Sequence, residues 1–231
     1  MYPAMFPELL AAERRKTMHA QADAFRLGKQ ARATRPASHG HRFLYGAVAA
    51  LRRLGVSIRP VEPGDATLIS EGFDRLSAES RRLRFLGPKT SLSSSELRYF
   101  TDIDHHDHEA LIAVSRFSGR SLGVARFIRL ADDPTTADVA VVIADEWQRA
   151  GLGSALTARL VERARCEGIA RFSALLDAEN EGARRLMRRT GASVRLVGRD
   201  GGTMSYEMEL APLGPGLRRA LARPADCVGV A

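Results

Sequence analysis

The residue pattern with the clearest chemical meaning is Gln148-x-x-Gly151-x-Gly153, which lies between an expected strand and an expected helix. Because glycine has no Cβ, Gly151 and Gly153 allow a tight turn and let a ligand approach the backbone closely. The loop runs into a helix expected from Ser154, and the first N–H groups of a helix have no acceptor within it. These N–H groups and the positive end of the helix dipole are typical of a pyrophosphate-binding site.

Two common phosphate-binding loops are excluded by the same residues. No Gly-Lys-Ser/Thr follows the glycines, so the loop is not a Walker loop. Leu156 occupies the position of the third glycine in the dinucleotide-binding pattern G-x-G-x-x-G. A bare Gly-x-Gly also occurs in other tight strand–helix turns, so its meaning depends on the elements around it.

The hydrophobic pattern predicts an α/β unit with the element order β-α-α-β-β-β-α-β-α-β-β. We expect strands at residues 56–61, 109–115, 121–130, 137–144, 172–176, 194–197 and 204–210. We expect helices at 66–85, as one or two helices, at 97–103 after serine caps, at 154–167 and at 181–189. The predicted organisation is a basic, helical or partly disordered extension (1–55), one domain (56–210) and a tail (211–231).

The loop in this setting resembles the acetyl-CoA loop of the GNAT N-acetyltransferase family. A second block agrees, because strand 172–176 is followed by Asp177-Ala178-Glu179-Asn180 and then by a helix that reaches Thr190-Gly191-Ala192. The resemblance covers about residues 56–210. It implies an α/β (α+β) fold with a central mixed, mostly antiparallel sheet flanked by helices. In this family the strand matching 137–144 is splayed from the next one, and the pantetheine arm lies between them.

The resemblance also implies which residues hold acetyl-CoA. The backbone amides of Val141 and Ile143, on either side of Val142, would hold the thioester carbonyl and the pantetheine. The Asn180 side chain would bind near the pantetheine. The pyrophosphate would bind to the loop that consists of Gln148, Arg149, Ala150, Gly151, Leu152, Gly153 and Ser154. Attack of an amine on a thioester builds an oxyanion, which a fixed N–H donor stabilises.

Asp138 is the candidate general base. Many relatives carry a glutamate ten residues before the first residue of the loop motif, and that position is Asp138 here. Aspartate is one methylene shorter, so we expect a bridging water; an ordinary strand-start aspartate is the alternative. Glu146 is a weaker candidate. Many relatives also have a tyrosine as general acid where this chain has Met187, which has no proton to give.

The expected acceptor is the amine of a protein lysine. Relatives without the tyrosine include the protein-lysine acetyltransferases that modify acyl-CoA synthetases, and the segments 80–88, 97–99 and 104–113 are similar to theirs. A small-molecule amine is the main alternative acceptor. A non-catalytic sensor that binds acyl-CoA is a third reading, and Met187 and Asp138 are the departures that favour it.

Composition and charge limit the classes of binding partner that we expect. Residues 1–60 hold eleven Lys/Arg against three acids, which accounts for the whole net charge of +8. Such a basic arm attracts nucleic acid, anionic lipid or an acidic partner, or is a solvated extension. Without interleaved aromatics or a recognition motif, we expect no nucleic-acid partner.

The remaining residue types indicate a cytoplasmic protein without a metal. We expect no membrane partner, because no apolar stretch approaches the roughly 20 residues of a membrane span, and we expect no secretory signal. Two cysteines, Cys166 and Cys227, need no disulfide framework. The side chains of His105-His106-Asp107-His108 diverge as sequence neighbours, so we expect a polar turn and no metal site. A homodimer is left open.

Overall fold

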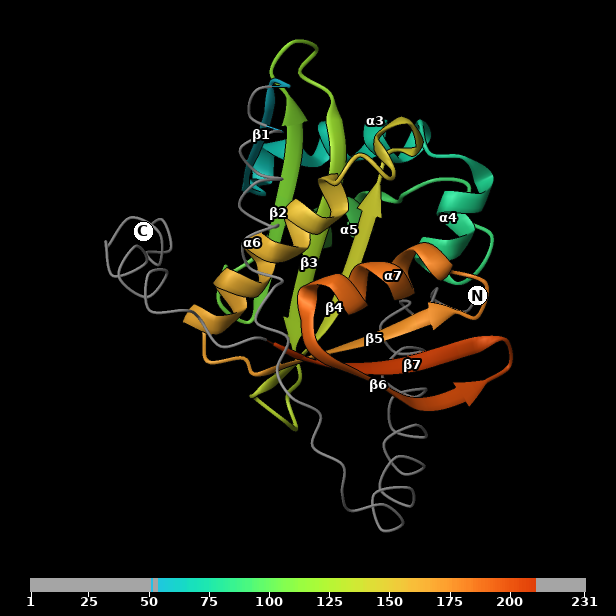
Figure 1. The fold of residues 1–231 in the computed structure, drawn as a ribbon. Coiled ribbons are helices and arrows are strands. Elements are labelled where there is room, and N and C mark those ends of the chain that lie inside the picture. The colour runs from blue at the N-terminus through green and yellow to red at the C-terminus, as the bar shows by residue number, and fades with distance from the viewer. Residues whose placement is uncertain (1–50, 52–53, 211–231) are drawn as a thin grey trace, which may run out of the picture.

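A seven-stranded mixed sheet with the order β1-β2-β3-β4-β5-β7-β6 forms the centre of the fold (Figure 1). The structure is a computed structural model that describes residue 51 and residues 54–210. The strands are β1 (Val56–Pro60), β2 (His108–Ser115), β3 (Ser121–Arg129), β4 (Thr136–Ile143), β5 (Arg171–Asp177), β6 (Gly191–Asp200) and β7 (Thr203–Leu210). All neighbouring strands are antiparallel except β4 and β5, which are parallel.

Helices cover both faces of the sheet. They are α3 (Ala66–Asp74), α4 (Ala78–Phe85), α5 (Ser94–Thr101), α6 (Leu152–Cys166) and α7 (Glu181–Thr190), with 3-10 turns at Pro63–Asp65 and Asp145–Trp147. Helices α6 and α7 lie on one face, and α3 and α5 lie on the other (Figure 1). The predicted order of elements and the GNAT-type sheet are confirmed, and the expected helical region 66–85 is a pair of helices.

The main core lies between the sheet and α6. Leu152, Leu156 and Leu160 recur on one face of α6, and each is 0% exposed. They pack in one cluster with Phe127 of β3 and Phe172 of β5. A smaller cluster on the opposite face joins α3 to β2. The core therefore fixes α6, and with it the glycine loop, against the middle of the sheet.

The expected terminal segments lie almost entirely outside the described residues. This applies to the basic extension up to residue 50 and to the tail 211–231. Leu51 is described, and it is buried in the main core cluster. Among the described helices, none is long and apolar enough to cross a membrane.

Candidate active site

The central feature of the site is an opening between β4 and β5. The two parallel strands pair over only three positions, Thr136↔Arg171, Ala137↔Phe172 and Asp138↔Ser173. Beyond Asp138 the strands separate, and Figure 1 shows them pointing in different directions. The splayed pair expected from the sequence is therefore present.

Asp133 ties the closed end of this opening. Its Oδ2 accepts hydrogen bonds from Thr136 Oγ1 of β4 (2.8 Å) and from Arg171 Nη2 of β5 (2.6 Å). Burial alone would raise the pKa of Asp133, but the hydrogen bonds from Thr135, Thr136 and Arg171 outweigh burial and lower it far below its usual range. The ionised carboxylate is therefore the form that holds the two strands together.

Backbone N–H groups of β4 face the opening. Ala144 donates to Leu122 O at 2.9 Å, toward β3. Because N–H directions alternate along a strand, the N–H groups of Val141 and Ile143 face away from β3. Among the described strands, none lies opposite them, since the pairing with β5 ends at Asp138. The N–H of Val142 faces β3, so Val142 does not share this position.

The glycine loop presents a second set of backbone donors. Gly151 is the N-cap of α6 with φ 88°, a left-handed conformation that suits glycine, and Arg149 also has a positive φ of 62°. The first turn of α6 carries no acidic residue and no side-chain cap. Within residues 54–210, the N–H groups of Gly151, Leu152, Gly153 and Ser154 find no hydrogen-bond acceptor. An anion is the ligand that such a helix start binds.

The Gln148 side chain has a structural role that sequence reasoning missed. Its Nε2 donates to Ser80 Oγ at 3.0 Å and lies 3.3 Å from both Ile143 O and Asp145 Oδ1. Gln148 thus fastens the start of the loop to the end of β4 and to α4.

Helix α4 is attached to both sides of the opening. On the β4 side, Asp145 accepts from Ser77 N (2.8 Å), Ser77 Oγ (2.9 Å) and Ser80 Oγ (2.6 Å). On the β5 side, Arg82 pairs with Asp177 (2.6 Å) and Glu179 (2.9 Å). The only local sign of this arrangement is Ser77, whose side chain caps α4 by accepting from Ser80 N.

Comparison with known proteins assigns this architecture. Residues 77–192, half of the chain, match the family model described as acetyltransferase (GNAT) family. The chain belongs to the GNAT acetyltransferase family. The resemblance found in the sequence is confirmed, and the domain is that of an acyltransferase enzyme family.

Two curated relatives carry the name acetyltransferase. Acetyltransferase Pat of Mycolicibacterium smegmatis is 31% identical over 156 residues, which cover 68% of this chain and 46% of that protein. Acetyltransferase PA5475 of Pseudomonas aeruginosa is 31% identical over 133 residues, which cover 57% of this chain and 71% of that protein. This GNAT chain therefore spans less than half the length of the first relative.

Solved structures agree with these relatives. The GNAT domain of Streptomyces lividans PAT is 27% identical with a TM-score of 0.61, over 67% of this chain and 90% of that one. The yncA protein of Salmonella typhimurium, solved with acetyl-CoA, has a TM-score of 0.55 at 21% identity, over 68% of this chain and 95% of that one, and shows a shared fold. The resemblance to the Pat branch of the GNAT family is thus supported by both comparisons.

Asp138 lies at the closed end of the GNAT opening. It is partly buried. It alternates along β4 with Val139, so it shares a face with Ala140 and Val142, which line a pocket. Val141 is three residues further along, about 10 Å at 3.3 Å per residue. Glu146 is exposed in the 3-10 turn after β4.

Asn180 and Met187 lie on α7. Asn180 is the N-cap, and its Oδ1 accepts from Ala183 N at 2.9 Å. This bond leaves the Nδ2 group of Asn180 as the side-chain donor for a ligand. Met187 is 6% exposed and packs in the main core cluster, so the position of the usual tyrosine holds an apolar side chain.

The histidine cluster does not converge on one point. His105 Nδ1 lies 2.9 Å from Glu109 Oε1, His106 Nδ1 contacts Glu167, and His108 Nε2 lies 3.2 Å from Arg126 Nη1. Within the described part of the chain, no group of three His, Cys, Asp or Glu residues could hold a metal ion. The three histidines therefore serve separate contacts around the start of β2.

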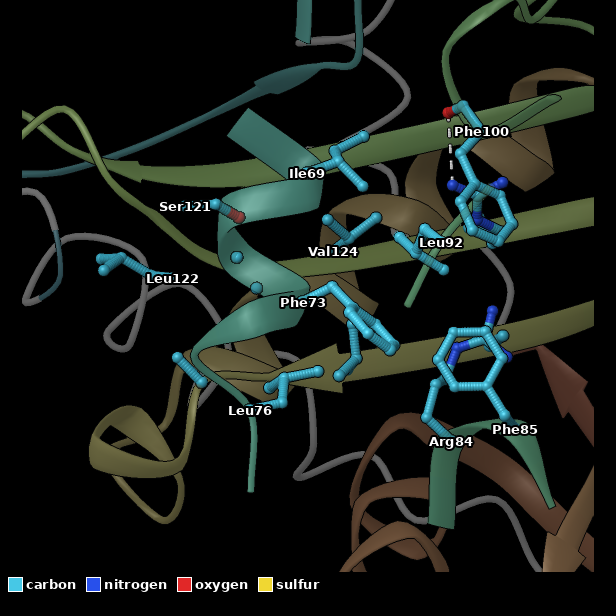
Figure 2. A pocket seen from close by; sticks show the side chains of 16 residues that line it. Ile69, Phe73, Leu76, Arg84, Phe85, Leu92, Phe100, Ser121, Leu122 and Val124 are labelled. Atoms are coloured by element: carbon cyan, nitrogen blue, oxygen red, sulfur yellow. Dashed lines mark hydrogen bonds between the residues drawn. The ribbon is translucent and has the colours of Figure 1, made fainter. Parts of the chain in front are cut away.

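A pocket lies between the sheet and helices α3, α4 and α5 (Figure 2). It contains about 600 Å³ of empty space, part of it open to solvent. Ala140 and Val142 of β4 form part of its wall, next to the residues whose N–H groups face the opening. The pocket therefore borders the segment of β4 that lines the opening.

Proposed function

We propose that this chain transfers an acetyl group from acetyl-CoA directly to a primary amine, and that the amine is a lysine side chain of a protein. The observation that carries the proposal is the early end of the β4–β5 pairing at Asp138, which leaves the N–H groups of Val141 and Ile143 facing an open slot. Within the GNAT family, this slot is where the pantetheine arm lies.

The backbone donors fit acetyl-CoA. The N–H groups from Arg149 to Ser154 would hold the pyrophosphate, because they surround the uncapped start of α6. Val141, Ile143 and the Asn180 amide would hold the pantetheine and the thioester carbonyl. Bound acetyl-CoA would supply an activated acyl group with a thiolate as its leaving group.

The proposed reaction is a direct transfer. Asp138 takes a proton from the substrate ammonium through a water molecule, and the neutral nitrogen then attacks the thioester carbonyl. The N–H of Val141 stabilises the oxyanion that forms, and the nitrogen of this intermediate loses its second proton to solvent. Collapse of the intermediate then breaks the C–S bond and yields the amide. The thiolate leaves without a proton from position 187, which is tolerable because a thiol has a pKa of about 8.5.

The choice of a lysine acceptor rests on the relatives. The segments 80–88, 97–99 and 104–113 are similar to those of protein-lysine acetyltransferases that act on acyl-CoA synthetases, and the two Pat comparisons support that branch. In the structure, the first two segments are parts of α4 and α5, and these helices lie over the pocket next to β4.

Release of CoA thiol from acetyl-CoA tests the proposal. The acceptors are a purified acyl-CoA synthetase, polyamines, amino sugars and amino acids, each with wild type and with Asp138→Asn. Turnover with the protein acceptor alone, lost in the variant, is the expected result. Turnover with a small amine would reassign the acceptor. Binding of acetyl-CoA without release to any acceptor would indicate a sensor and contradict the proposed catalysis.

A further inference from the structure

The pocket next to β4 is lined by two arginines and by mostly apolar side chains (Figure 2). Arg84 comes from α4, and Arg126 comes from β3. Much of the surrounding wall is apolar or aromatic, and it includes Ile69, Phe73, Phe85, Leu92, Phe100 and Val142. Charged side chains are rare in such surroundings unless they are paired, so their partners are informative.

The partners of Arg126 are all neutral. Its side chain donates to Phe100 O (3.3 Å) and to His108 Nε2 (3.2 Å), and its guanidinium lies 4.3 Å from the centre of the Phe100 ring. Because a guanidinium only donates, His108 Nε2 acts as an acceptor, and the ring is neutral. Burial, together with the charge of Arg126, lowers the pKa of His108 to about 4, which agrees with a neutral ring. Arg126 is only 6% exposed, and among the described residues no carboxylate affects its pKa.

Arg84 also lacks an anionic partner within the described part of the chain. Its guanidinium lies 5.1 Å from the centre of the Phe85 ring, and it makes no hydrogen bond or ion pair with another described residue. Burial lowers the pKa of Arg84 to about 10. Burial and the nearby charge of Arg84 lower the pKa of Arg126 to about 9, whereas the nearby Tyr99 side chain raises the pKa of both arginines. Both groups are therefore charged at neutral pH and repel each other in the pocket.

Other arginines of this fold have the carboxylate partner that Arg84 and Arg126 lack among the described residues. Arg163 pairs with the buried carboxylate of Glu109 at 2.8 Å, and Arg59 forms a two-pronged pair with Asp65 at 2.6 and 2.7 Å. Among residues 54–210, a carboxylate thus lies against arginines at other sites but not at Arg84 and Arg126. Two positive charges without a counter-charge, aimed into an apolar pocket, form a site for an anionic group from outside.

We propose that this pocket binds a carboxylate on a short apolar stem, with Arg84 and Arg126 as its two guanidinium partners. A guanidinium matches the planar geometry of a carboxylate, and the apolar wall suits a chain of a few methylenes. If the proposed acyl transfer is right, the carboxylate belongs either to the acyl group, as in a dicarboxylic acyl-CoA, or to an acidic side chain next to the acceptor amine. Both sources fit, because Ala140 and Val142 flank the strand position that would hold the thioester.

Calorimetric binding of acetyl-CoA and succinyl-CoA tests the acyl source. The proteins are wild type, Arg84→Met, Arg126→Met and Arg199→Met, in which Arg199 is an exposed arginine of β6 outside the pocket. We expect wild type and Arg199→Met to bind succinyl-CoA about tenfold more tightly than acetyl-CoA, and both pocket variants to bind the two esters equally. Arg84→Met keeps the test valid if the more buried Arg126→Met fails to fold.

Lysine peptides test the acceptor source. With acetyl-CoA as donor, the KM for a peptide with glutamate beside the lysine is compared with that for the glutamine peptide. A KM preference for glutamate that disappears in both pocket variants supports the acceptor source. The proposal would be overturned if the pocket variants had the same succinyl-CoA to acetyl-CoA affinity ratio as wild type and also the same ratio of KM values for the two peptides.

Glutarate separates this proposal from the proposed function. We expect glutarate to raise the Tm of wild type and of Arg199→Met but not of the pocket variants. That result without binding of either CoA ester would retain the carboxylate pocket and reject the acyltransferase. The opposite result is that the CoA esters bind but the pocket variants change neither the effect of glutarate nor the preference among esters or peptides. That result would retain the acyltransferase and reject the carboxylate pocket.

Discussion

Asp138 of β4 and Ser173 of β5 form the last pair before these two parallel strands separate. The candidate base is therefore held at the vertex of the opening, where backbone pairing on both sides of β4 limits its movement. Asp138 therefore lies apart from the N–H groups of Val141 and Ile143, which are further along the same strand.

Replacing Asp138 should remove catalysis without removing binding. We expect Asp138→Asn to lower kcat by about 10²–10⁴-fold, because the water next to it would lose its proton acceptor. The dissociation constant of acetyl-CoA should stay within about twofold, since the CoA contacts are backbone groups elsewhere. Asp138→Glu should restore part of kcat. Steady-state kinetics and calorimetry measure the two effects, and an Asn variant with wild-type kcat would place the base elsewhere.

Gly151 should affect acyl-CoA binding through its backbone. Its φ of 88° is strained for any residue with a side chain, at a cost of about 1–2 kcal/mol, so we expect Gly151→Ala to weaken acyl-CoA binding by about 5–30-fold. Gly168, just beyond the C-terminus of α6, has φ 78° and is the matched control. An added Cβ meets no atom within 4 Å at either glycine. Equal binding losses in Gly151→Ala and Gly168→Ala would show that the loop is not the site.

Asp145 should stabilise α4, and its loss should also lower activity toward the acceptor. Asp145→Ala removes the acceptor of three hydrogen bonds from Ser77 and Ser80. We expect a loss of about 1–2 kcal/mol in the free energy of unfolding, together with a lower kcat/KM for the acceptor. Denaturant unfolding and steady-state kinetics measure these effects. Glu146→Ala, at the neighbouring exposed position, is the control for stability and should leave the free energy of unfolding unchanged.

Asp133 should make stability depend on acid pH. Its pKa in the folded chain is lowered, so its contribution is fully present well above the ordinary aspartate pKa of about 3.9 and is lost as pH falls below it. We expect Asp133→Asn to have a lower Tm than wild type at pH 7, and we expect this difference in Tm to be clearly smaller near pH 2. Thermal melts across this range measure the difference. A gap in Tm that does not change with pH would mean that the carboxylate charge is not involved.

Local sequence patterns predicted most of the fold. Ser93 and Glu96 form the expected cap of α5, with Ser93 Oγ accepting from Glu96 N and Glu96 accepting from Ser93 N. The strands and α6 follow their hydrophobic periodicity to within a few residues. Strand β6 was predicted at 194–197 but spans Gly191–Asp200, because pairing with β7 extends a segment whose glycines have little strand propensity.

The missed features of the site depend on contacts between distant parts of the chain. Arg82 reaches Asp177 across 95 residues, and Gln148 reaches Ser80 across 68 residues. In the sequence, Arg82 and Arg84 belong to a run of charges that suits a solvated helix. Only the fold shows that one arginine braces the opening and that the other shares a pocket with Arg126. The glycine loop was found from the sequence because its chemistry is contained in six consecutive residues.

The attachment of α4 to both sides of the opening has a consequence for how the slot responds to a ligand. No residue of α4 is fully buried, whereas α6 contributes eight buried residues. Surface hydrogen bonds and ion pairs of α4 therefore set the width of the opening between β4 and β5. The hydrophobic core holds the strands and α6 beneath it. Amide hydrogen exchange should then be much faster in α4 than in α6, and it should slow in α4 when both substrates are bound. We therefore expect α4 to adjust its position when the substrates bind, while the core around α6 stays nearly unchanged.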